Sequence, residues 1–389
     1  MNAVKVILRN RISSVTGSRC FATTKKKIPD PDEDESLPIF QYPVSKSSDR
    51  RMYVWGLAET GALGIHMTRG KKGRKQYRNN FTHCWHPMRS SFAERFDITG
   101  LSAGRAHTAI LTDNEGVFTL GNNAYGQCGR RINPNEEYRG SMVSHNIKKL
   151  GKQNIINVCC GQDHTLFLTE GGKVYACGWG ADGQTGLGTF ENQATPAPVQ
   201  GDITSEKIVK MASTGDCVLA LNDKGELFGW GNSEYGQIPM KNASQQVNMS
   251  YALVDFTRGL GKIVDVAAGG SFCLIVNEGG DAFVWGYGLL GLGPNVQATP
   301  KPTQIPPPLF GRNEFNPECC VKKVACGIGH LAAITNNGDL YMWGRNRQGC
   351  LGLGHMKDQF FPLKVAIGAH VLKVSCSVDH SVAVCKPFI

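Results

Sequence analysis

Residues 174–188 read VYACGWGADGQTGLG and contain a formal G-x-G-x-x-G motif at 178–183. In a dinucleotide-binding fold this motif follows a strand and opens a helix, and an acidic residue lies about 20 positions further on. Residues 174–177 suit a strand, but the stretch that follows, TGLGTFENQATPAP, is too rich in Gly, Pro and Thr to form a helix. A second match begins at Gly286 and runs into Pro294. Two such matches in similar settings indicate a repeated unit.

Glycine segments of one pattern, close to W-G-x-N-x-x-G-Q-L-G-x-G, recur along the chain. They read VWGLAETGALG, TLGNNAYGQCG, ACGWGADGQTGLG, GWGNSEYGQI, VWGYGLLGLG and MWGRNRQGCLGLG. The first glycines of these segments lie 53 to 65 residues apart and are Gly56, Gly121, Gly178, Gly231, Gly286 and Gly344. This regular spacing predicts a structural repeat.

A second motif recurs between the glycine segments. In its clearest copies a glycine is followed three positions later by a histidine, as in Gly104/His107, Gly161/His164 and Gly327/His330. In two further copies we interpret Asp216 and Phe272 as replacements of the histidine, and the last copy keeps His380 behind Ser377. A catalytic histidine is normally unique, whereas these recur at equivalent positions. We therefore interpret them as structural.

Each second motif is followed by an apolar strand, a polar turn that carries a glycine, and another strand that ends in the first motif. Two strands with a glycine turn, repeated about every 55 residues, predict an all-β propeller. The G-x-G-x-x-G is then a turn between strands. We count six blades. The first strand, at 50–56, lacks a preceding histidine motif, and the last histidine motif, at 376–385, lacks a following glycine segment. We expect these two to pair and to close the ring, which removes a free sheet edge. Residues 65–100 match no repeat.

Composition limits the function classes. The chain has 389 residues, 47 Gly and 14 Cys, but no C-x-x-C pair and no apolar run long enough for a membrane span. The stretch HCWH at 83–86 lacks a second ligand pair at a spacing that suits zinc. No Walker loop, H-E-x-x-H motif or paired-carboxylate motif occurs. We therefore predict no enzyme chemistry, no cofactor and no metal.

The N-terminus resembles a targeting segment. Residues 1–27 contain seven Lys or Arg residues and no acid, with apolar residues at helical spacing between them. We predict a mitochondrial transit peptide at 1–21, a disordered linker at 22–49 that includes the acidic run PDPDEDES, and the propeller at 50–389. A disordered basic tail is the alternative interpretation of the first segment. Removal of residues 1–21, with their four basic side chains, would lower the net charge from +10 to +6.

One basic segment is a candidate contact for RNA phosphates or acidic lipid. It contains Arg69, Lys71, Lys72, Arg74, Lys75 and Arg78, together with Tyr77. A solvated loop without a partner is an equally good interpretation of this segment.

The two repeated motifs together resemble the repeat of the regulator-of-chromosome-condensation family of β-propellers, from about Met52 to the C-terminus. The basic N-terminus and the segments CGQDHTLFLT, CGWGADGQTGLG, FGWGNSEYGQ and SFCLIV…VWGYGLLGLGPN are similar to the mitochondrial branch of that family. Members of the family usually have seven blades, which is one more than the six counted in this chain.

The resemblance implies a non-catalytic, guanine-nucleotide-exchange-factor-like scaffold in the mitochondrial matrix. Its partners would be ribosomal RNA and assembly factors of the large mitochondrial ribosomal subunit, in ribosome biogenesis. The alternative is an exchange factor for the dynamin-related GTPase of inner-membrane fusion, with peripheral association with that membrane. The sequence leaves both roles open.

Overall fold

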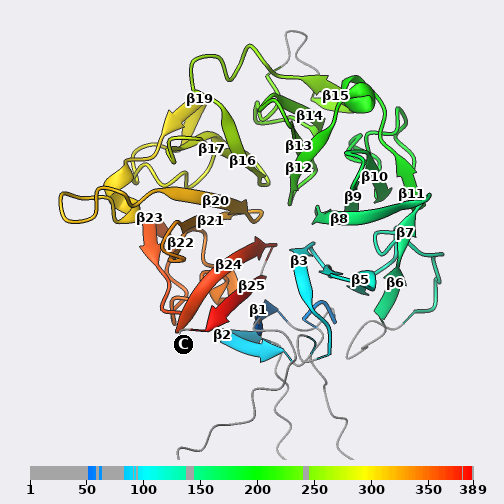
Figure 1. Ribbon diagram of the computed structural model, residues 1–389, viewed down its shortest axis with the longest axis horizontal. Coiled ribbons are helices and arrows are strands. Elements are labelled where there is room, and N and C mark those ends of the chain that lie inside the picture. The colour runs from blue at the N-terminus through cyan, green and yellow to red at the C-terminus, as the bar shows by residue number, and fades with distance from the viewer. Residues whose placement is uncertain are drawn as a thin grey trace, which may run out of the picture. The chain divides into compact units, whose positions relative to one another are not determined.

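The computed structural model describes residues 51–57, 61–63, 83–90, 92, 95–136, 144–239, 245–378 and 380–387, all within one compact unit. These residues form six antiparallel sheets arranged around a centre, so the structure is an all-β propeller of six blades (Figure 1). The fold class and the number of blades expected from the repeat are confirmed.

The first blade shows how the sequence builds each sheet. It consists of β3 (Ile98–Ala103), β4 (His107–Thr112), β5 (Gly116–Gly121) and β6 (Ser144–Ile147), paired in that order from the centre outward. Every residue of β4 is buried, because this strand has a neighbouring strand on both edges and a neighbouring blade on both faces. The hairpin between β4 and β5 closes at Gly116, whose φ of 78° favours glycine.

Four further blades repeat this order, and the second adds the two-residue strand β7 beside β8. The second contains β7 (Lys149–Leu150), β8 (Gln153–Cys160), β9 (His164–Thr169), β10 (Val174–Gly178) and β11 (Gln193–Pro198). The third contains β12 (Ile208–Ser213), β13 (Cys217–Asn222), β14 (Leu227–Asn232) and β15 (Gln246–Ala252). The fourth contains β16 (Ile263–Ala268), β17 (Phe272–Asn277), β18 (Ala282–Tyr287) and β19 (Ala298–Gln304). The fifth contains β20 (Val321–Cys326), β21 (His330–Thr335), β22 (Leu340–Gly344) and β23 (Gln359–Lys364).

The sixth blade joins the two ends of the propeller. Its order is β2 (His83–Ser90), β1 (Arg51–Leu57), β25 (His380–Pro387) and β24 (Ala369–Cys376). β1 pairs with β25 in antiparallel register, with Met52 opposite Val384 and Gly56 opposite His380. The expected closure by strands from both ends of the propeller is therefore confirmed. The segment 65–100 supplies the outer strand β2. It matched no repeat because outer strands carry neither motif.

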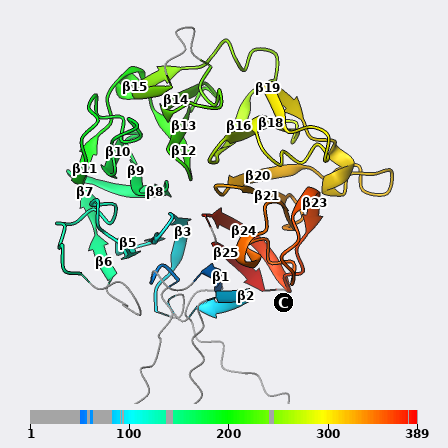
Figure 2. The same ribbon diagram turned by 180° about the vertical axis from the view of Figure 1, so that it is seen from behind.

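The ring has no gap between its last and first blades. β24 and β3 lie side by side in both views (Figure 2), and the Ala103 amide of β3 donates a hydrogen bond of 2.8 Å to the Ser375 hydroxyl of β24. The Ser377 hydroxyl, just after β24, donates another to the Gly104 carbonyl, just after β3. A ring of six blades is thus complete without a seventh.

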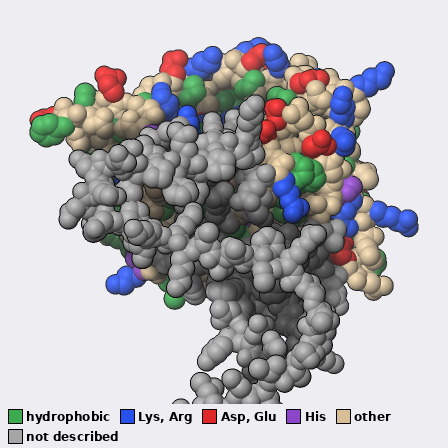
Figure 3. Space-filling model, turned by 60° about the horizontal axis from the view of Figure 1, so that its bottom comes forward, with side chains coloured by type: hydrophobic (Ala, Val, Ile, Leu, Met, Phe, Trp, Pro, Cys, Tyr) green, Lys and Arg blue, Asp and Glu red, His purple; other side chains and the backbone are tan. Residues whose placement is uncertain are grey.

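The propeller has two faces, the loop face and the hairpin face. The loop face carries the turns that precede β4 and its equivalents, and the glycine loops that follow β5 and its equivalents. The hairpin face carries the hairpins and the links between blades. On the coloured part of the surface, basic and acidic side chains are interspersed (Figure 3). Among the described residues the helices with given bounds are one-turn 3-10 segments, η2 (Asp202–Ser205), η3 (Pro307–Phe310) and η4 (Arg347–Gly349), and none could span a membrane.

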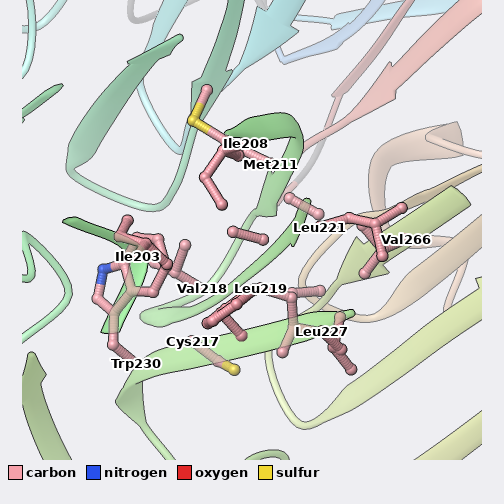
Figure 4. Close-up of a cluster of buried hydrophobic side chains, with 14 of the residues drawn as sticks. Ile203, Ile208, Met211, Cys217, Val218, Leu219, Leu221, Leu227, Trp230 and Val266 are labelled. Atoms are coloured by element: carbon pink, nitrogen blue, oxygen red, sulfur yellow. The ribbon is translucent and has the colours of Figure 1, made fainter. Parts of the chain in front are cut away.

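The core lies between neighbouring blades. Around Trp230 of β14, one buried cluster joins residues of the second, third and fourth blades, among them Met211, Leu219 and Val266 (Figure 4). Burial of each such side chain contributes about 1.5–3 kcal/mol. The Trp230 Nε1 donates a hydrogen bond of 3.1 Å to the Gln184 carbonyl in the loop of the second blade. The tryptophan that precedes the repeated glycine therefore fastens one blade to the loop of the preceding one.

Candidate interface surfaces

The recurring histidines lie buried at the starts of β4, β9, β21 and β25. Each pairs in register with the first glycine of a glycine segment: His107 with Gly121, His164 with Gly178, His330 with Gly344 and His380 with Gly56. The two motifs that recur apart in the sequence thus meet at one position of each blade, at the loop face.

In three of the four copies, the glycine three residues before the histidine makes room for the ring. A Cβ atom added to Gly104, Gly161 or Gly327 would lie 2.1, 1.9 or 2.3 Å from the Cε1 atom of that histidine. No side chain can occupy that space without displacing the ring. The G-x-x-H spacing is therefore a packing requirement of the turn.

Three of the histidines also join neighbouring blades. The Nε2 atoms of His107, His164 and His330 lie 2.9, 3.2 and 3.3 Å from the hydroxyls of Thr165, Ser213 and Ser381 in the next blade. Each of these hydroxyls donates its own proton to a backbone carbonyl, of Gln127, Cys217 or Cys350 respectively. Each hydroxyl must therefore accept from the histidine, which assigns the proton to Nε2.

Burial keeps these rings neutral. Desolvation is the largest cause that lowers the pKa of His107, His164 and His330 to about 3, and that of His380 to about 4. A neutral, buried ring that is held between two blades is suited to packing and not to proton transfer with a solvent-borne substrate.

The register corrects one interpretation of the sequence. In the third blade the residue opposite Gly231 is Cys217, not Asp216, so the cysteine replaces the histidine there. Asp216 lies one residue earlier, where its carboxylate accepts hydrogen bonds of 3.3 and 3.0 Å from the Gln162 and Gln184 amides. Burial, and then the charge of Asp182, raises the pKa of Asp216 to about 6. The alignment by sequence was off by one because the glycine of this copy, Gly215, lies one position later in the turn, and Thr214 takes the usual place of the glycine.

The G-x-G-x-x-G segment forms turns. The Gly183 amide donates to the Gly180 carbonyl at 2.8 Å, and the Gly186 amide donates to the Gly183 carbonyl at 2.9 Å. Gly178 has a φ of 111°, and a Cβ on it would lie 2.4 Å from the Asp163 carbonyl oxygen. The first glycines Gly121, Gly231, Gly286 and Gly344 share the positive φ. The helix start that would bind a phosphate is replaced here by consecutive turns.

The candidate basic contact, Arg69, Lys71, Lys72, Arg74, Lys75 and Arg78, lies outside the described residues. The HCWH stretch falls on β2, of whose side chains at 83–89 nothing is described. Within the described ranges, no group of three or more His, Cys, Asp or Glu side chains is placed to hold a metal ion.

Two aromatic pairs on the loop face escaped the sequence analysis. Tyr235 of the third blade and Tyr287 of the fourth stack with ring centroids 6.0 Å apart and an interplanar angle of 16°. They are 47% and 46% exposed, which leaves much of the stacked pair open to solvent. Tyr125 and Trp179 make a second contact, between the first and second blades, with centroids 4.6 Å apart in an edge arrangement. Tyr125 and Tyr235 both precede the G-Q of their glycine segments, which is the signal that could have found this pattern.

Exposed arginines share the loop face with the stacked tyrosines. Arg345 directly follows Gly344, and its amide donates to the Gly329 carbonyl at 2.8 Å, which places it over the turn of the fifth blade. Arg347 is exposed two residues later. Arg105, in the turn of the first blade, forms an ion pair of 2.6 Å with Asp163. The face therefore offers aromatic surface and guanidinium groups, with nearby carboxylates that limit its net charge.

The six sheets with their buried histidines and glycine loops define a β-propeller built from one repeated unit. The chain belongs to the RCC1-like domain family, whose family model matches residues 49–387. It is 44% identical over 350 residues to the human "RCC1-like G exchanging factor-like protein", which covers 89% of this chain and 74% of the relative. The mouse protein of the same name is 45% identical over 346 residues, with the same coverage.

Solved structures agree with this fold. The crystal structure of human WBSCR16 superposes with a TM-score of 0.72 at 38% identity, over 87% of this chain and 100% of that one. Prp20p of Saccharomyces cerevisiae superposes with a TM-score of 0.64 at 18% identity, over 87% of this chain and 92% of that one, and shows the fold alone. The family that the repeats resembled is thereby confirmed, and the mitochondrial branch stays a prediction.

Proposed function

We propose that this protein is a non-catalytic, exchange-factor-like propeller scaffold of the mitochondrial matrix. It binds ribosomal RNA through its loop face and supports assembly of the large mitochondrial ribosomal subunit. The main support for an RNA contact is the half-exposed Tyr235–Tyr287 stack, which lies on the same face as Arg345.

This combination suits single-stranded RNA. Unpaired bases stack on aromatic side chains and on guanidinium planes, while basic groups contact the phosphates. The backbone of Tyr287 is fixed to the preceding turn, because the Ser271 hydroxyl donates a hydrogen bond of 2.6 Å to the Tyr287 carbonyl. A stack that is held in place before binding loses little conformational entropy when a base adds to it.

The charge distribution fits a local contact. The chain has a net charge of +10, yet the coloured surface in Figure 3 mixes both signs. On this part of the surface an RNA would therefore be bound at particular loops and not over a broad basic area. Each phosphate that is neutralised by a basic side chain adds to the dependence of the affinity on salt.

The first experiment measures binding of labelled fragments of the large mitochondrial ribosomal RNA at about 50–200 mM salt. We expect the double variant Tyr235→Ala, Tyr287→Ala to bind about 5- to 150-fold more weakly, which corresponds to ~1–3 kcal/mol for a lost base stack. The matched control is Phe315→Ala, because Phe315 is 97% exposed in the link between η3 and β20 on the hairpin face. Equal binding by the control and the double variant would contradict an RNA contact at the stack.

A charge variant tests the same face independently. We expect Arg345→Gln to weaken RNA binding and to reduce its salt dependence, since one phosphate contact would be lost. Its control is Arg258→Gln, because Arg258 is as basic and is also exposed, but lies on the hairpin face and pairs with Asp255 at 2.6 Å. An equal loss in both variants would show only a nonspecific effect of net charge.

Nucleotide exchange on a dynamin-related GTPase of the inner membrane is the second candidate. The names of the human and mouse relatives favour it, since both are called G exchanging factor-like proteins. The mechanism would need only a loop that weakens GDP binding, without covalent chemistry. The test is release of fluorescent GDP from the purified GTPase. Acceleration by this protein together with absent RNA binding would replace the RNA proposal with this one.

A further inference from the structure

One link between blades extends beyond the ring. Residues 311–320, which connect η3 to β20, leave the rim of the propeller between the fourth and fifth blades, as the yellow-to-orange loop in Figures 1 and 2 shows. We call this segment the 311–320 loop. Its Phe315 is 97% exposed, whereas Met356, the next most exposed large apolar residue of the described chain, is 60% exposed. The loop therefore presents a large aromatic side chain almost entirely to solvent.

The fold itself does not use Phe315. The link is already anchored by Phe310, which is 2% exposed and packs against Tyr341 and Trp343 with ring centroids 5.8 Å apart in each pair. Phe315 has no comparable packing, because almost all of its surface is open. An aromatic side chain buries about 150–250 Å² when it is covered, and such residues are the usual anchors of protein interfaces. The position of Phe315 therefore suits a contact with a partner.

The turn that carries Phe315 has a fixed conformation. The Asn313 side-chain oxygen accepts hydrogen bonds of 2.9 Å from the amides of Phe315 and Asn316. At the base of the loop, the Arg312 Nε donates a hydrogen bond of 2.8 Å to the Cys319 carbonyl. These bonds position the aromatic side chain before a partner binds, so that binding costs little conformational entropy of the loop.

The charges of the loop restrict the kind of partner. Glu314 and Glu318 flank Phe315 in the sequence, both are exposed, and neither is paired with a basic side chain of the described residues. The basic side chain of the loop, Arg312, forms an ion pair of 3.4 Å with Asp281. Exposed carboxylates repel RNA phosphates and acidic lipid headgroups but attract the lysine and arginine side chains of a protein. The charge therefore favours a protein partner over RNA or an acidic membrane.

We propose that the 311–320 loop is the docking site for a protein partner with an apolar pocket that is rimmed by lysine or arginine. Phe315 enters the pocket, and Glu314 and Glu318 pair with the basic rim. The loop lies on the hairpin face, whereas Tyr235 and Tyr287 lie on the loop face. The contact is therefore separate from the proposed RNA contact, and the propeller can connect an RNA to a protein.

The first test identifies what Phe315 touches. The photoreactive residue benzoylphenylalanine replaces Phe315 in the tagged full chain, which is irradiated in mitochondrial matrix extract, and the cross-linked peptides are sequenced by mass spectrometry. The matched control carries the same residue in place of Phe361, which is also on the outer rim but is 45% exposed and has uncharged neighbours on both sides.

We expect cross-links from position 315 to one protein, at a peptide that contains lysine or arginine. These cross-links should be absent from position 361 and lost in the variant Glu314→Lys, Glu318→Lys. Cross-links from position 315 to RNA, to lipid or to a second copy of this chain would overturn the proposal. The same set of proteins from both positions, cross-links that survive the charge reversal, or no cross-link at all would also overturn it.

The affinity of the cross-linked protein, once purified, measures the contribution of the aromatic side chain. We expect Phe315→Ala to bind this partner about tenfold or more weakly, as for an aromatic anchor at an interface. The Tm of this variant should equal that of the wild type, because Phe315 is 97% exposed. Its RNA binding should also be unchanged, which separates a failure of this proposal from a failure of the RNA contact. Equal affinity of Phe315→Ala and the wild type for the partner would refute the docking.

The charge of the loop is tested with the same purified partner. We expect Glu314→Lys, Glu318→Lys to slow association and to remove the attraction that salt would otherwise screen. The control Glu191→Lys, Glu234→Lys changes the net charge equally at two exposed glutamates outside the loop and should associate as the wild type does. Equal slowing in both variants would show an effect of net charge alone and would contradict a basic rim around the pocket.

Discussion

The His164 Nε2 atom lies 3.2 Å from the Ser213 hydroxyl of the next blade, and that hydroxyl donates to the Cys217 carbonyl at 2.9 Å. One histidine thus connects two blades and fixes the proton on its own ring. The same arrangement recurs at His107 and His330, so the G-x-x-H motif holds neighbouring blades together.

The packing of Gly161 against His164 makes a specific prediction. A Cβ on Gly161 would lie 1.9 Å from the histidine ring, and the three nearest atoms all belong to that ring. We expect Gly161→Ala to lower the free energy of unfolding by about 2–4 kcal/mol, because the ring must move away from Ser213. The measurement is denaturant unfolding.

A double-mutant cycle provides the control for this prediction. In Gly161→Ala, His164→Ala the added methyl group meets no ring, so the combined loss should be smaller than the sum of the two single losses. Gly368→Ala should have a negligible effect, since nothing lies within 4 Å of the position that its Cβ would take and its φ is not in the left-handed region. Additive losses in the cycle would show that the glycine is needed for another reason.

Acid should destabilise the propeller through its buried histidines. Each binds a proton readily only when unfolded, because burial lowers the folded pKa of His107, His164 and His330 to about 3, below the ordinary 6.5. Their stabilising effect is therefore complete above pH 6.5 and is lost as the pH falls toward 3. In that window each histidine lowers the free energy of unfolding by up to ~1.4 kcal/mol for each unit by which the pH falls.

Asp216 acts in the opposite direction between pH 6 and pH 3.8. Burial raises its folded pKa to about 6, so that the folded state binds the proton more tightly and gains stability as the pH falls through this window. One carboxyl offsets about one histidine, so net loss of stability in acid is still expected. The variant His164→Phe, which copies the Phe272 found at the equivalent position of the fourth blade, should have a shallower slope of stability against pH. An unchanged slope would contradict the assignment of the acid sensitivity to these rings.

The predicted transit peptide is tested by import into isolated mitochondria. We expect the chain to be protected from external protease and to begin at Ala22 after processing, as N-terminal sequencing would show. Replacement of Arg9, Arg11 and Arg19 by glutamine should prevent import, because the segment would lose most of its positive charge. Efficient import of that variant would favour the alternative, a basic tail without a targeting role.

The basic segment is tested by charge reversal. Glutamate at Arg69, Lys71, Lys72, Arg74, Lys75 and Arg78 should weaken RNA binding and flatten its salt dependence if these residues contact phosphates. The control reverses Lys148, Lys149 and Lys152, three exposed lysines of the described chain near the link to the second blade, and changes the net charge by half as much. Effects in proportion to the number of reversed charges would identify general electrostatic attraction and no specific contact.

Much of the fold follows from the sequence, because the turns that build a blade demand glycine at fixed positions. The pairs His107–Gly121 and His164–Gly178 carry both motifs, so β4, β5 and their equivalents could be located. Outer strands such as β2 pack along one edge only and tolerate many side chains, so no motif marked them.

The surfaces were harder to predict than the strands. The Tyr235–Tyr287 stack joins different positions of two glycine loops, and only the curvature of the ring brings them together.

The central claim is that the propeller acts on the large mitochondrial ribosomal subunit through RNA. The most direct measurement is sedimentation of matrix extracts that contain the tagged protein on a sucrose gradient, with and without RNase. We predict co-migration with the large subunit that is lost after RNase treatment, and weakened in the variant Tyr235→Ala, Tyr287→Ala. Migration as free protein under both conditions would contradict the account.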